Sequence, residues 1–389
     1  MTDVRVLFVT HAYPRHPGDA AGSFLHRLAL ALTAGGTAVR VLAPAGTDLA
    51  RAEVLEGIPV HRFRYAPGPW ETLAYTGTMA EQVLGSVRGK VALAGMLAAG
   101  TLALRQQVAE FRPDVVHVHW WFPGGLLALG GARRVPLLLT MHGSDVRLAR
   151  KVKPAHAFLR RVLARAAEAT AVSGWLAREA MAMAPGAAVD VAPMPADVSA
   201  FRADAAARVP GRFLFVGRLN AQKGVADLLD AFAQQPAPAT LEVIGEGELG
   251  PALRAQADRL GVASRVTWRG PVSRDALPGA YASAAAVVIP SLEEGLGLVA
   301  AEAQLCGTPV IGYASGGLPD VVDAATGGTL VPPGDIAALA QAMRARLAAG
   351  APDPKVTAAA RARMLERFSP DAVAAGYRAR YERLATRGR

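Results

Sequence analysis

The sequence is poor in cysteine and in aromatic residues. Only one of its 389 residues is a cysteine, Cys306, which excludes a disulfide framework and a metal site built from several thiolates. Aromatic residues make up 6% of the chain. A nucleic-acid-binding groove would require aromatic residues interleaved with basic ones, and the sequence has no such segment. We therefore expect a protein of a reducing compartment, the cytoplasm, with no nucleic-acid partner and no metal.

Long apolar runs are also missing. The N-terminus passes directly into a strand-like segment, Val4–Thr10, without the charged and apolar regions of a secretory signal. The most lipid-like run is Val91–Leu104, fourteen residues long, whereas a spanning helix needs about 20. This run therefore predicts a helix buried in a core.

Positive charge is in excess, with a formal net charge of +10. Its densest concentration lies in residues 147–165, where Arg150, Lys151, Lys153, Arg160 and Arg161 alternate with apolar residues. Such a helix can rest on an anionic membrane face. It can equally be a solvated surface helix. The first interpretation predicts a peripheral protein on the inner face of the cell membrane.

Short apolar segments alternate with amphipathic helical ones, the pattern of parallel β-sheets joined by helices. A segment without a clear period, 193–211, separates two such halves. The expected fold class is thus α/β, with two doubly wound, Rossmann-like domains at residues 1–195 and 196–367. Domains of this kind bind ligands at the carboxyl ends of their strands, so we expect the site in a cleft between them.

The most informative segment runs from Ser291 to Ala303. It follows a predicted strand, turns through Gly295, Leu296 and Gly297, and enters a helix, where free N–H groups suit a diphosphate. Glu294 and Glu302 lie on the order of 10 Å apart at helical rise. This separation suits a ligand with sugar hydroxyls at one end and a ribose at the other.

Two further strand ends carry related signals. Arg218 and Lys223 follow the first strand of the second half, where cations would meet phosphate and stabilise a departing diphosphate. Gly245 ends the next strand in a similar turn, and Val272 follows the strand after it. All of these residues belong to the predicted donor-binding part of the site.

Together these motifs resemble retaining glycosyltransferases of family 4, which have the GT-B fold. The resemblance covers nearly the whole chain. In the second half it rests on the Glu294-x7-Glu302 spacing, Val-Gly-Arg-Leu-x3-Lys-Gly and Gly316-Gly317-Leu318-Pro319. In the first half it rests on Thr10-His11-Ala12-Tyr13-Pro14, Gly22-Ser23-Phe24, His117-Val118-His119-Trp120 and His142-Gly143-Ser144-Asp145. The motifs of the first half most resemble those of bacterial members that build surface polysaccharides.

The resemblance implies a role for each matching residue. Glu302 would bind the donor ribose, Glu294 the donor sugar, and Arg218 with Lys223 the diphosphate. His142 would lie near the transferred sugar. The acceptor side would be formed by the remaining first-half candidates, Gly22, Ser23, His119 and Asp145. A C-terminal helix at about 368–389 would pack back on the first domain.

The implied activity is metal-independent transfer, with retention, from a nucleotide diphosphate sugar to an acceptor hydroxyl. UDP and GDP are the expected nucleotides, no cofactor is expected, and the acceptor is a glycan, a lipid-linked glycan or a small molecule. Two alternatives stay open: a nucleotide-sugar 2-epimerase and a non-catalytic binding protein of the same fold. A hydrolase is disfavoured, because no Gly-x-Ser-x-Gly motif surrounds Ser173.

Overall fold

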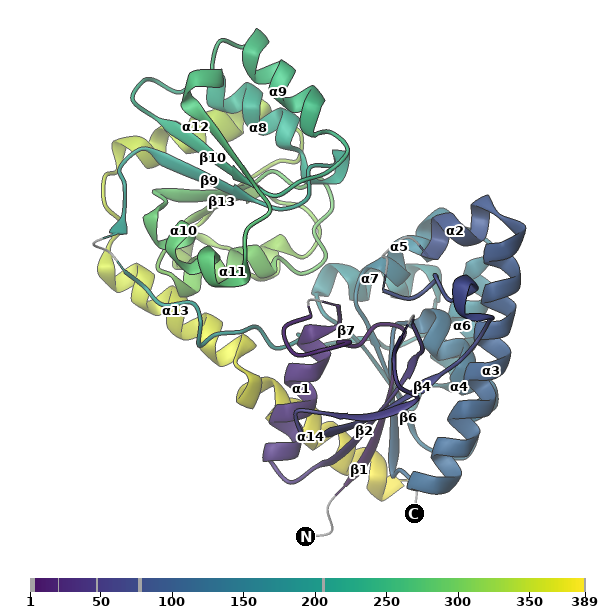
Figure 1. Ribbon diagram of the computed structural model, residues 1–389. Helices are drawn as coiled ribbons and strands as arrows, with labels where there is room; N and C mark the ends of the chain where they lie inside the picture. Colours follow the sequence, from purple (N-terminus) through teal and green to yellow (C-terminus); the bar gives the residue numbers. More distant parts are fainter. Residues whose placement is uncertain (1–3, 20, 47, 76–78, 205–206, 388–389) are drawn as a thin grey trace. The chain divides into compact units, whose positions relative to one another are not determined.

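The computed structural model describes residues 4–19, 21–46, 48–75, 79–204 and 207–387. The chain forms two compact units, each with its own parallel sheet (Figure 1). The first comprises Met1–Pro195 together with Pro370–Arg389, and the second comprises Ala196–Ser369. The last helix of the chain is therefore part of the first unit.

Within the described residues, the first unit has an eight-stranded sheet in the order β3-β4-β2-β1-β5-β6-β7-β8. Every pair in it is parallel except β3 with β4. The central strands are buried on both faces, as their unbroken apolar sequences predict. The strands are β1 (Arg5–Val9), β2 (Ala38–Pro44), β3 (Ala52–Leu55), β4 (Ile58–Phe63), β5 (Val115–His119), β6 (Leu137–Met141), β7 (Glu168–Ala171) and β8 (Asp190–Val191).

Helices cover both faces of this sheet (Figure 1). They are α1 (Ser23–Ala34), η1 (Gly68–Trp70), α2 (Met79–Gly85), α3 (Val87–Phe111), η2 (Trp121–Gly125), α4 (Leu126–Gly131), α5 (Ser144–Lys151), α6 (Ala155–Arg165), α7 (Gly174–Met183) and α14 (Pro370–Arg387). Two expectations were wrong here. The apolar run 91–104 lies inside a 25-residue helix, α3, of which only part is buried, and the basic stretch 147–165 is divided between α5 and α6 at Pro154.

A buried polar chain ties α14 to the first sheet. The His117 ring bonds the Tyr381 hydroxyl through Nδ1 and the Thr140 hydroxyl through Nε2, both at 2.7 Å. Thr140 in turn bonds Thr170 at 2.7 Å. Because leaving any of these buried groups unpaired would cost about 1–3 kcal/mol, the chain holds α14 on strands β5 and β6. His117 is thus a structural histidine.

In the second unit, the described residues form a six-stranded, wholly parallel sheet in the order β11-β10-β9-β12-β13-β14. Its strands are β9 (Arg212–Val216), β10 (Thr240–Ile244), β11 (Val266–Gly270), β12 (Ala286–Ile289), β13 (Val310–Tyr313) and β14 (Thr329–Val331). Its longer helices are α8 (Val225–Ala233), α9 (Gly250–Arg259), α10 (Leu277–Ser283), α11 (Leu298–Leu305), α12 (Ile336–Ala348) and α13 (Pro354–Phe368). Strand order reverses at β9, which places a topological switch point at its carboxyl end.

Candidate functional site

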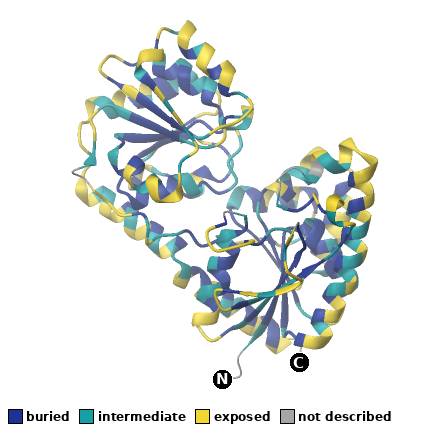
Figure 2. Cartoon of the chain, in the orientation of Figure 1, coloured by how far each residue is buried: buried dark blue, intermediate teal, exposed yellow. Residues whose placement is uncertain are grey.

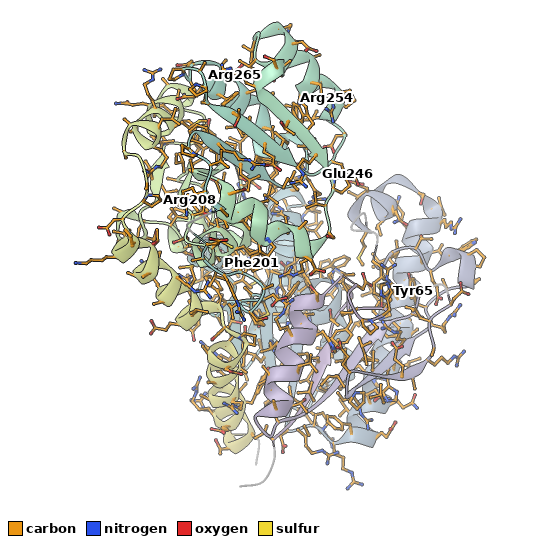
Figure 3. All side chains as sticks on the ribbon, turned by 60° about the vertical axis from the view of Figure 1, so that its left-hand side comes forward. Tyr65, Phe201, Arg208, Glu246, Arg254 and Arg265 are labelled. Atoms are coloured by element: carbon orange, nitrogen blue, oxygen red, sulfur yellow. The ribbon has the colours of Figure 1, made fainter. Side chains whose placement is uncertain are left out.

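The predicted donor-binding residues of the second unit lie in loops at the carboxyl ends of neighbouring strands. Arg218 follows β9, Gly245 follows β10 and Val272 follows β11, while Glu294 follows β12. Arg218 is exposed and Val272 half-buried. The loop after β10 also contains Glu246, labelled in Figure 3, whose carbonyl accepts a hydrogen bond from the Leu219 N–H at 2.8 Å. The sheet therefore gathers at one edge groups that the sequence separates by up to 76 positions.

Glycines allow these loops to pack backbone against backbone. A Cβ atom on Gly245, which has φ +130°, would lie 1.9 Å from the Gly217 carbonyl oxygen. A Cβ atom on Gly316, with φ +57°, would lie 2.0 Å from the carbonyl oxygen of Glu294. Both positions exclude any side chain. The position and orientation of Glu294 thus depend on a glycine in the loop after β13.

An ion pair joins the loops that follow β9 and β12. Lys223 Nζ lies 2.8 Å from Glu294 Oε2, and both side chains are largely buried. Two further bonds support this junction: Gln222 Nε2 donates to the Glu293 carbonyl at 2.7 Å, and the Leu292 N–H donates to the Gln222 carbonyl at 2.9 Å. The structure therefore brings together a cation and a carboxylate that the sequence predicted in separate loops.

Glu302 lies in α11, whose N-terminal cap, Gly297, has φ +87° and follows Gly295 and Leu296. Glu302 is 8% exposed, and its carboxylate accepts a hydrogen bond from the Tyr281 hydroxyl at 2.9 Å. Burial and this carboxylate raise the pKa of Tyr281 well above its ordinary value. Arg274 Nη2 lies 3.6 Å from the other carboxylate oxygen. Tyr281 and Arg274 therefore fix the orientation of the Glu302 carboxylate.

Tyr281 and Arg274 were not predicted from the sequence. Arg274 follows β11 at the carboxyl edge of the sheet, so its position after a strand could have suggested it. Tyr281 is on α10, twenty-one residues from Glu302, and no spacing pattern connects these two residues.

In the first unit, three histidines and two aromatic rings gather where β1, β5 and β6 end. His119 Nδ1 and His142 Nε2 are 3.2 Å apart. The His142 ring centroid lies 4.3 Å from that of Trp120 and 5.2 Å from that of Phe24, and His11 stacks edge-on against Trp120 at 4.3 Å. Burial and the neighbouring imidazoles lower the pKa of His142 well below its ordinary value. His142 is therefore neutral at pH 7 and acts as a hydrogen-bonding group, not as a cation.

The other acceptor-side candidates shape this cluster. Asp145 is 3% exposed, and its carboxylate accepts hydrogen bonds from the backbone N–H groups of Trp121, His142 and Gly143. His119 is fully buried. Gly22, with φ +70°, packs against the loop containing His11, since a Cβ there would lie 2.4 Å from the Ala12 carbonyl oxygen. Asp145 and Gly22 therefore position the loops that carry His142 and His11. Ser23, the first residue of α1, is half-buried.

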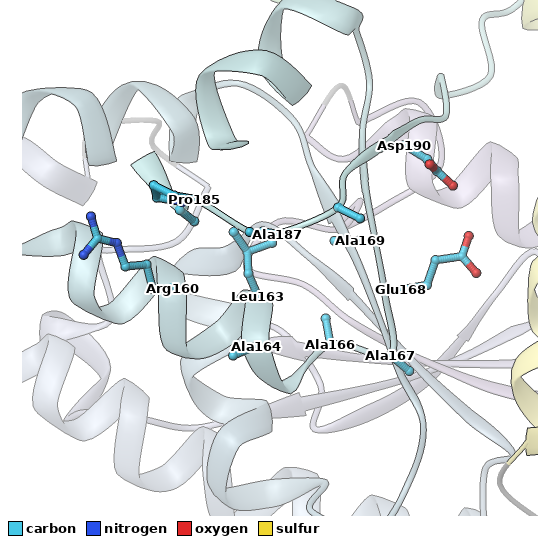
Figure 4. Close-up of a pocket in the computed structure, with 13 residues that line it drawn as sticks. Arg160, Leu163, Ala164, Ala166, Ala167, Glu168, Ala169, Pro185, Ala187 and Asp190 are labelled. Carbon is cyan, nitrogen blue, oxygen red and sulfur yellow. The ribbon is translucent and has the colours of Figure 1, made fainter. Parts of the chain in front are cut away.

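Two cavities of the first unit differ in their relation to this cluster. A cavity of about 330 Å³ is lined by His11, Ser144 and Asp145 together with Tyr75 and Phe122, so it adjoins the histidines. Another, of about 530 Å³, is lined by Arg160, Glu168 and Asp190 (Figure 4). Glu168 and Asp190 begin β7 and β8, so that cavity lies at the amino ends of the strands, the edge where doubly wound sheets do not bind ligands.

Two doubly wound units, one with a carboxylate, a lysine and an arginine at its strand ends, match the architecture of GT-B glycosyltransferases that use nucleotide sugars. Comparison with known proteins supports the same class. The model of the glycosyl transferase 4-like domain matches residues 19–197, and that of glycosyl transferases group 1 matches residues 210–349. The chain belongs to the group 1, family 4 glycosyltransferases.

Individual relatives are similar over most of their length. A D-inositol 3-phosphate glycosyltransferase of Xylanimonas cellulosilytica is 33% identical, over 86% of this chain and 87% of the relative. A glycogen synthase of Mycobacterium tuberculosis is 30% identical over 95% and 92%. Among solved structures, a sucrose-phosphate synthase from Thermosynechococcus elongatus has a TM-score of 0.78 with 24% identity, covering 99% of this chain and 100% of that one. Anabaena HepE in complex with UDP-glucose has a TM-score of 0.69 with 20% identity, covering 97% and 99%.

The neutral histidine cluster predicts that acid destabilises the first unit. Burial lowers the pKa of His11 to about 4, below its ordinary 6.5, so the unfolded chain binds a proton there between these values and the folded one does not. Stability is therefore complete above pH 6.5 and falls as pH drops toward 4, by about 2 kcal/mol for this residue at pH 5. Urea unfolding followed by tryptophan fluorescence measures the change, because four of the five tryptophans, Trp70, Trp120, Trp121 and Trp175, lie in this unit.

In the variant His11→Gln, the free energy of unfolding should fall by about 2 kcal/mol less between pH 7 and pH 5 than in the wild-type protein. Its matched control is His16→Gln, since His16 is exposed and hydrated in both states. A wild-type stability that stays constant from pH 7 to pH 5 would contradict the prediction.

Proposed function

We propose that this glycosyltransferase transfers a sugar from a UDP- or GDP-linked donor to an acceptor hydroxyl with retention of anomeric configuration and without a metal ion. The observation that carries the proposal is the Lys223–Glu294 ion pair, with Arg218 at the carboxyl end of the adjacent strand. A lysine and an arginine at this edge can stabilise a diphosphate leaving group without Mg²⁺.

The donor would be bound along the loops of the second unit. Glu302, oriented by Tyr281, would accept hydrogen bonds from the ribose hydroxyls. The N-terminus of α11 and its preceding Gly295, Leu296 and Gly297 would offer backbone N–H groups to the phosphates. Glu294 would bind the sugar hydroxyls. Gly245 and Val272, at the ends of β10 and β11, would line the nucleotide.

The first unit would supply the acceptor side. Neutral His142 can donate or accept a hydrogen bond at a sugar hydroxyl without adding charge next to a developing oxocarbenium ion. The cavity of about 330 Å³ beside His11 and Ser144 offers room for an acceptor. We propose a glycan, lipid-linked or small-molecule acceptor in a biosynthetic pathway of the cytoplasm, such as polysaccharide assembly.

In the proposed step, the acceptor oxygen forms a bond to the anomeric carbon on the face from which the diphosphate departs. The bond between the anomeric carbon and the phosphate oxygen breaks, and that oxygen takes the proton of the acceptor hydroxyl. Arg218 and Lys223 offset the negative charge that develops on the leaving diphosphate. Because this charge is greater in the transition state than in the bound donor, the two cations should lower the barrier more than they tighten substrate binding.

Arg218→Ala and Lys223→Ala should each lower kcat by about 10²-fold or more, the loss typical of removing one charge-stabilising group. Steady-state kinetics with the active donor measures this, and circular dichroism checks that each variant remains folded. Arg259→Ala is the matched control, because Arg259 is an exposed arginine at the end of α9 in the same unit. A nearly normal kcat in both site variants would contradict the assignment of Arg218 and Lys223 to the leaving diphosphate.

The stereochemistry of the product tests the proposed reaction. Incubation of UDP-glucose or GDP-mannose with an acceptor panel should produce an α-linked product from the α-linked donor, with an unchanged rate in EDTA, as followed by proton NMR. A β-linked product, or loss of activity in EDTA, would refute retention or metal independence. Conversion of the donor sugar to its C2 epimer without any acceptor would identify an epimerase instead.

A further inference from the structure

Helix α3 carries an apolar surface on its solvent side. Val87, Val91 and Leu102 are 76%, 52% and 62% exposed, and Ala94 and Ala98 between them are exposed as well. Figure 2 shows exposed positions along this helix. Their spacing of three and four residues aligns them along one side of the helix. We call these five residues the outer stripe of α3. Exposed aliphatic residues in a continuous row indicate a surface that is covered in use.

The opposite side of α3 is packed against the rest of the first unit. Ala92, Met96 and Leu104 are buried there. Gly100 allows close packing, since a Cβ atom at this position would lie 2.9 Å from both Leu127 and Phe63. By length and composition α3 is apolar enough to cross a membrane, but this packing leaves only the outer stripe for a lipid phase. The geometry suits a helix that lies in the membrane surface.

Basic and aromatic residues flank the outer stripe. Arg88 and Lys90 are exposed at its beginning and Arg105 at its end, while no charged residue occurs from Val91 to Leu104. Trp70 is 39% exposed, and the Arg88 guanidinium lies 5.4 Å from its ring centroid. Tryptophan and arginine beside an apolar surface match the chemistry of the headgroup region.

We infer that the outer stripe of α3 docks on an anionic lipid bilayer. The apolar side chains would enter the acyl boundary, and the flanking Arg88, Lys90 and Arg105 would meet lipid phosphates. A second copy of the chain fits less well. Antiparallel pairing of two α3 helices would bring Arg88 and Lys90 opposite Arg105, and parallel pairing would bring each opposite itself, so like charges would meet either way.

The other candidate for a membrane-binding surface is the basic stretch 147–165, which lies on α5 and α6. Its exposed large apolar residue is Phe158, which is 54% exposed. Cations of both surfaces bond to carbonyls within the protein: Arg160 donates to the Met183 carbonyl, while beside the outer stripe Arg88 donates to the Pro69 carbonyl and Arg105 to the Gly130 carbonyl. The two surfaces therefore differ mainly in their exposed apolar residues, three large or β-branched aliphatic positions and two alanines on α3 against one phenylalanine on α6. The outer stripe therefore offers more apolar area to a bilayer.

Co-sedimentation with vesicles tests the inference. The probes are phosphatidylcholine vesicles with and without about 30% phosphatidylglycerol, at low salt. Wild-type protein should bind the anionic vesicles. The double variant Val91→Asp/Leu102→Asp should bind them about tenfold or more weakly, because two carboxylates would enter the apolar layer. The matched control, Phe158→Asp on α6, should bind within about twofold of wild type.

Three outcomes would overturn the inference. The first is a wild-type protein that binds neither vesicle. The second is loss of binding in Phe158→Asp with retention in the double variant, which would assign the contact to α6. The third is a wild-type dimer in solution that the double variant converts to monomers. Melting curves of both variants exclude loss of fold, and because none of these residues lies in the donor loops, the result is independent of the proposed catalytic roles.

Discussion

The ion pair between Lys223 and Glu294 is the interaction on which the proposed donor site depends. It joins the loops after β9 and β12, and both partners are largely shielded from water. A partly buried pair of this kind is costly to break one partner at a time, because the remaining charge loses its counterpart. A donor that binds here must therefore replace the contacts it disrupts. The diphosphate of a nucleotide sugar would replace the carboxylate as the partner of Lys223, and the sugar hydroxyls would replace the lysine as the partners of Glu294.

The surrounding backbone is built to keep these groups in place. Gly245 and Gly316 let the loops approach to distances that any Cβ would prohibit, and the free N-terminus of α11 adds partial positive charge nearby. In the first unit the corresponding constraint is burial. It keeps the His142 and His119 imidazoles neutral, while the carboxylate of Asp145 fixes the loop that carries His142.

Much of this could be predicted from the sequence, because parallel sheets place motif residues at strand ends. The alternation of apolar segments located the strands, and the glycine-rich turns located the loops that carry Glu294, Arg218 and Lys223. Contacts between elements could not be predicted in this way. The hydrogen bond from Tyr281 to Glu302 joins two helices, and the burial of His119 and Asp145 depends on tertiary packing. The extent of α3 was missed because polar residues such as Arg88 and Gln107 mask its helical period beyond the apolar run.

The most direct test of the account is calorimetric titration of UDP, GDP and ADP into the wild-type protein and into Glu302→Gln, with the thermal shift of each complex measured alongside. The account predicts that one of these nucleotides binds, raises the melting temperature by mass action, and binds about tenfold or more weakly to the variant, because the ribose loses a charged hydrogen-bond acceptor. Binding of that nucleotide with equal affinity to both proteins would contradict the role of Glu302. No binding of any nucleotide at millimolar concentration would contradict the donor site itself.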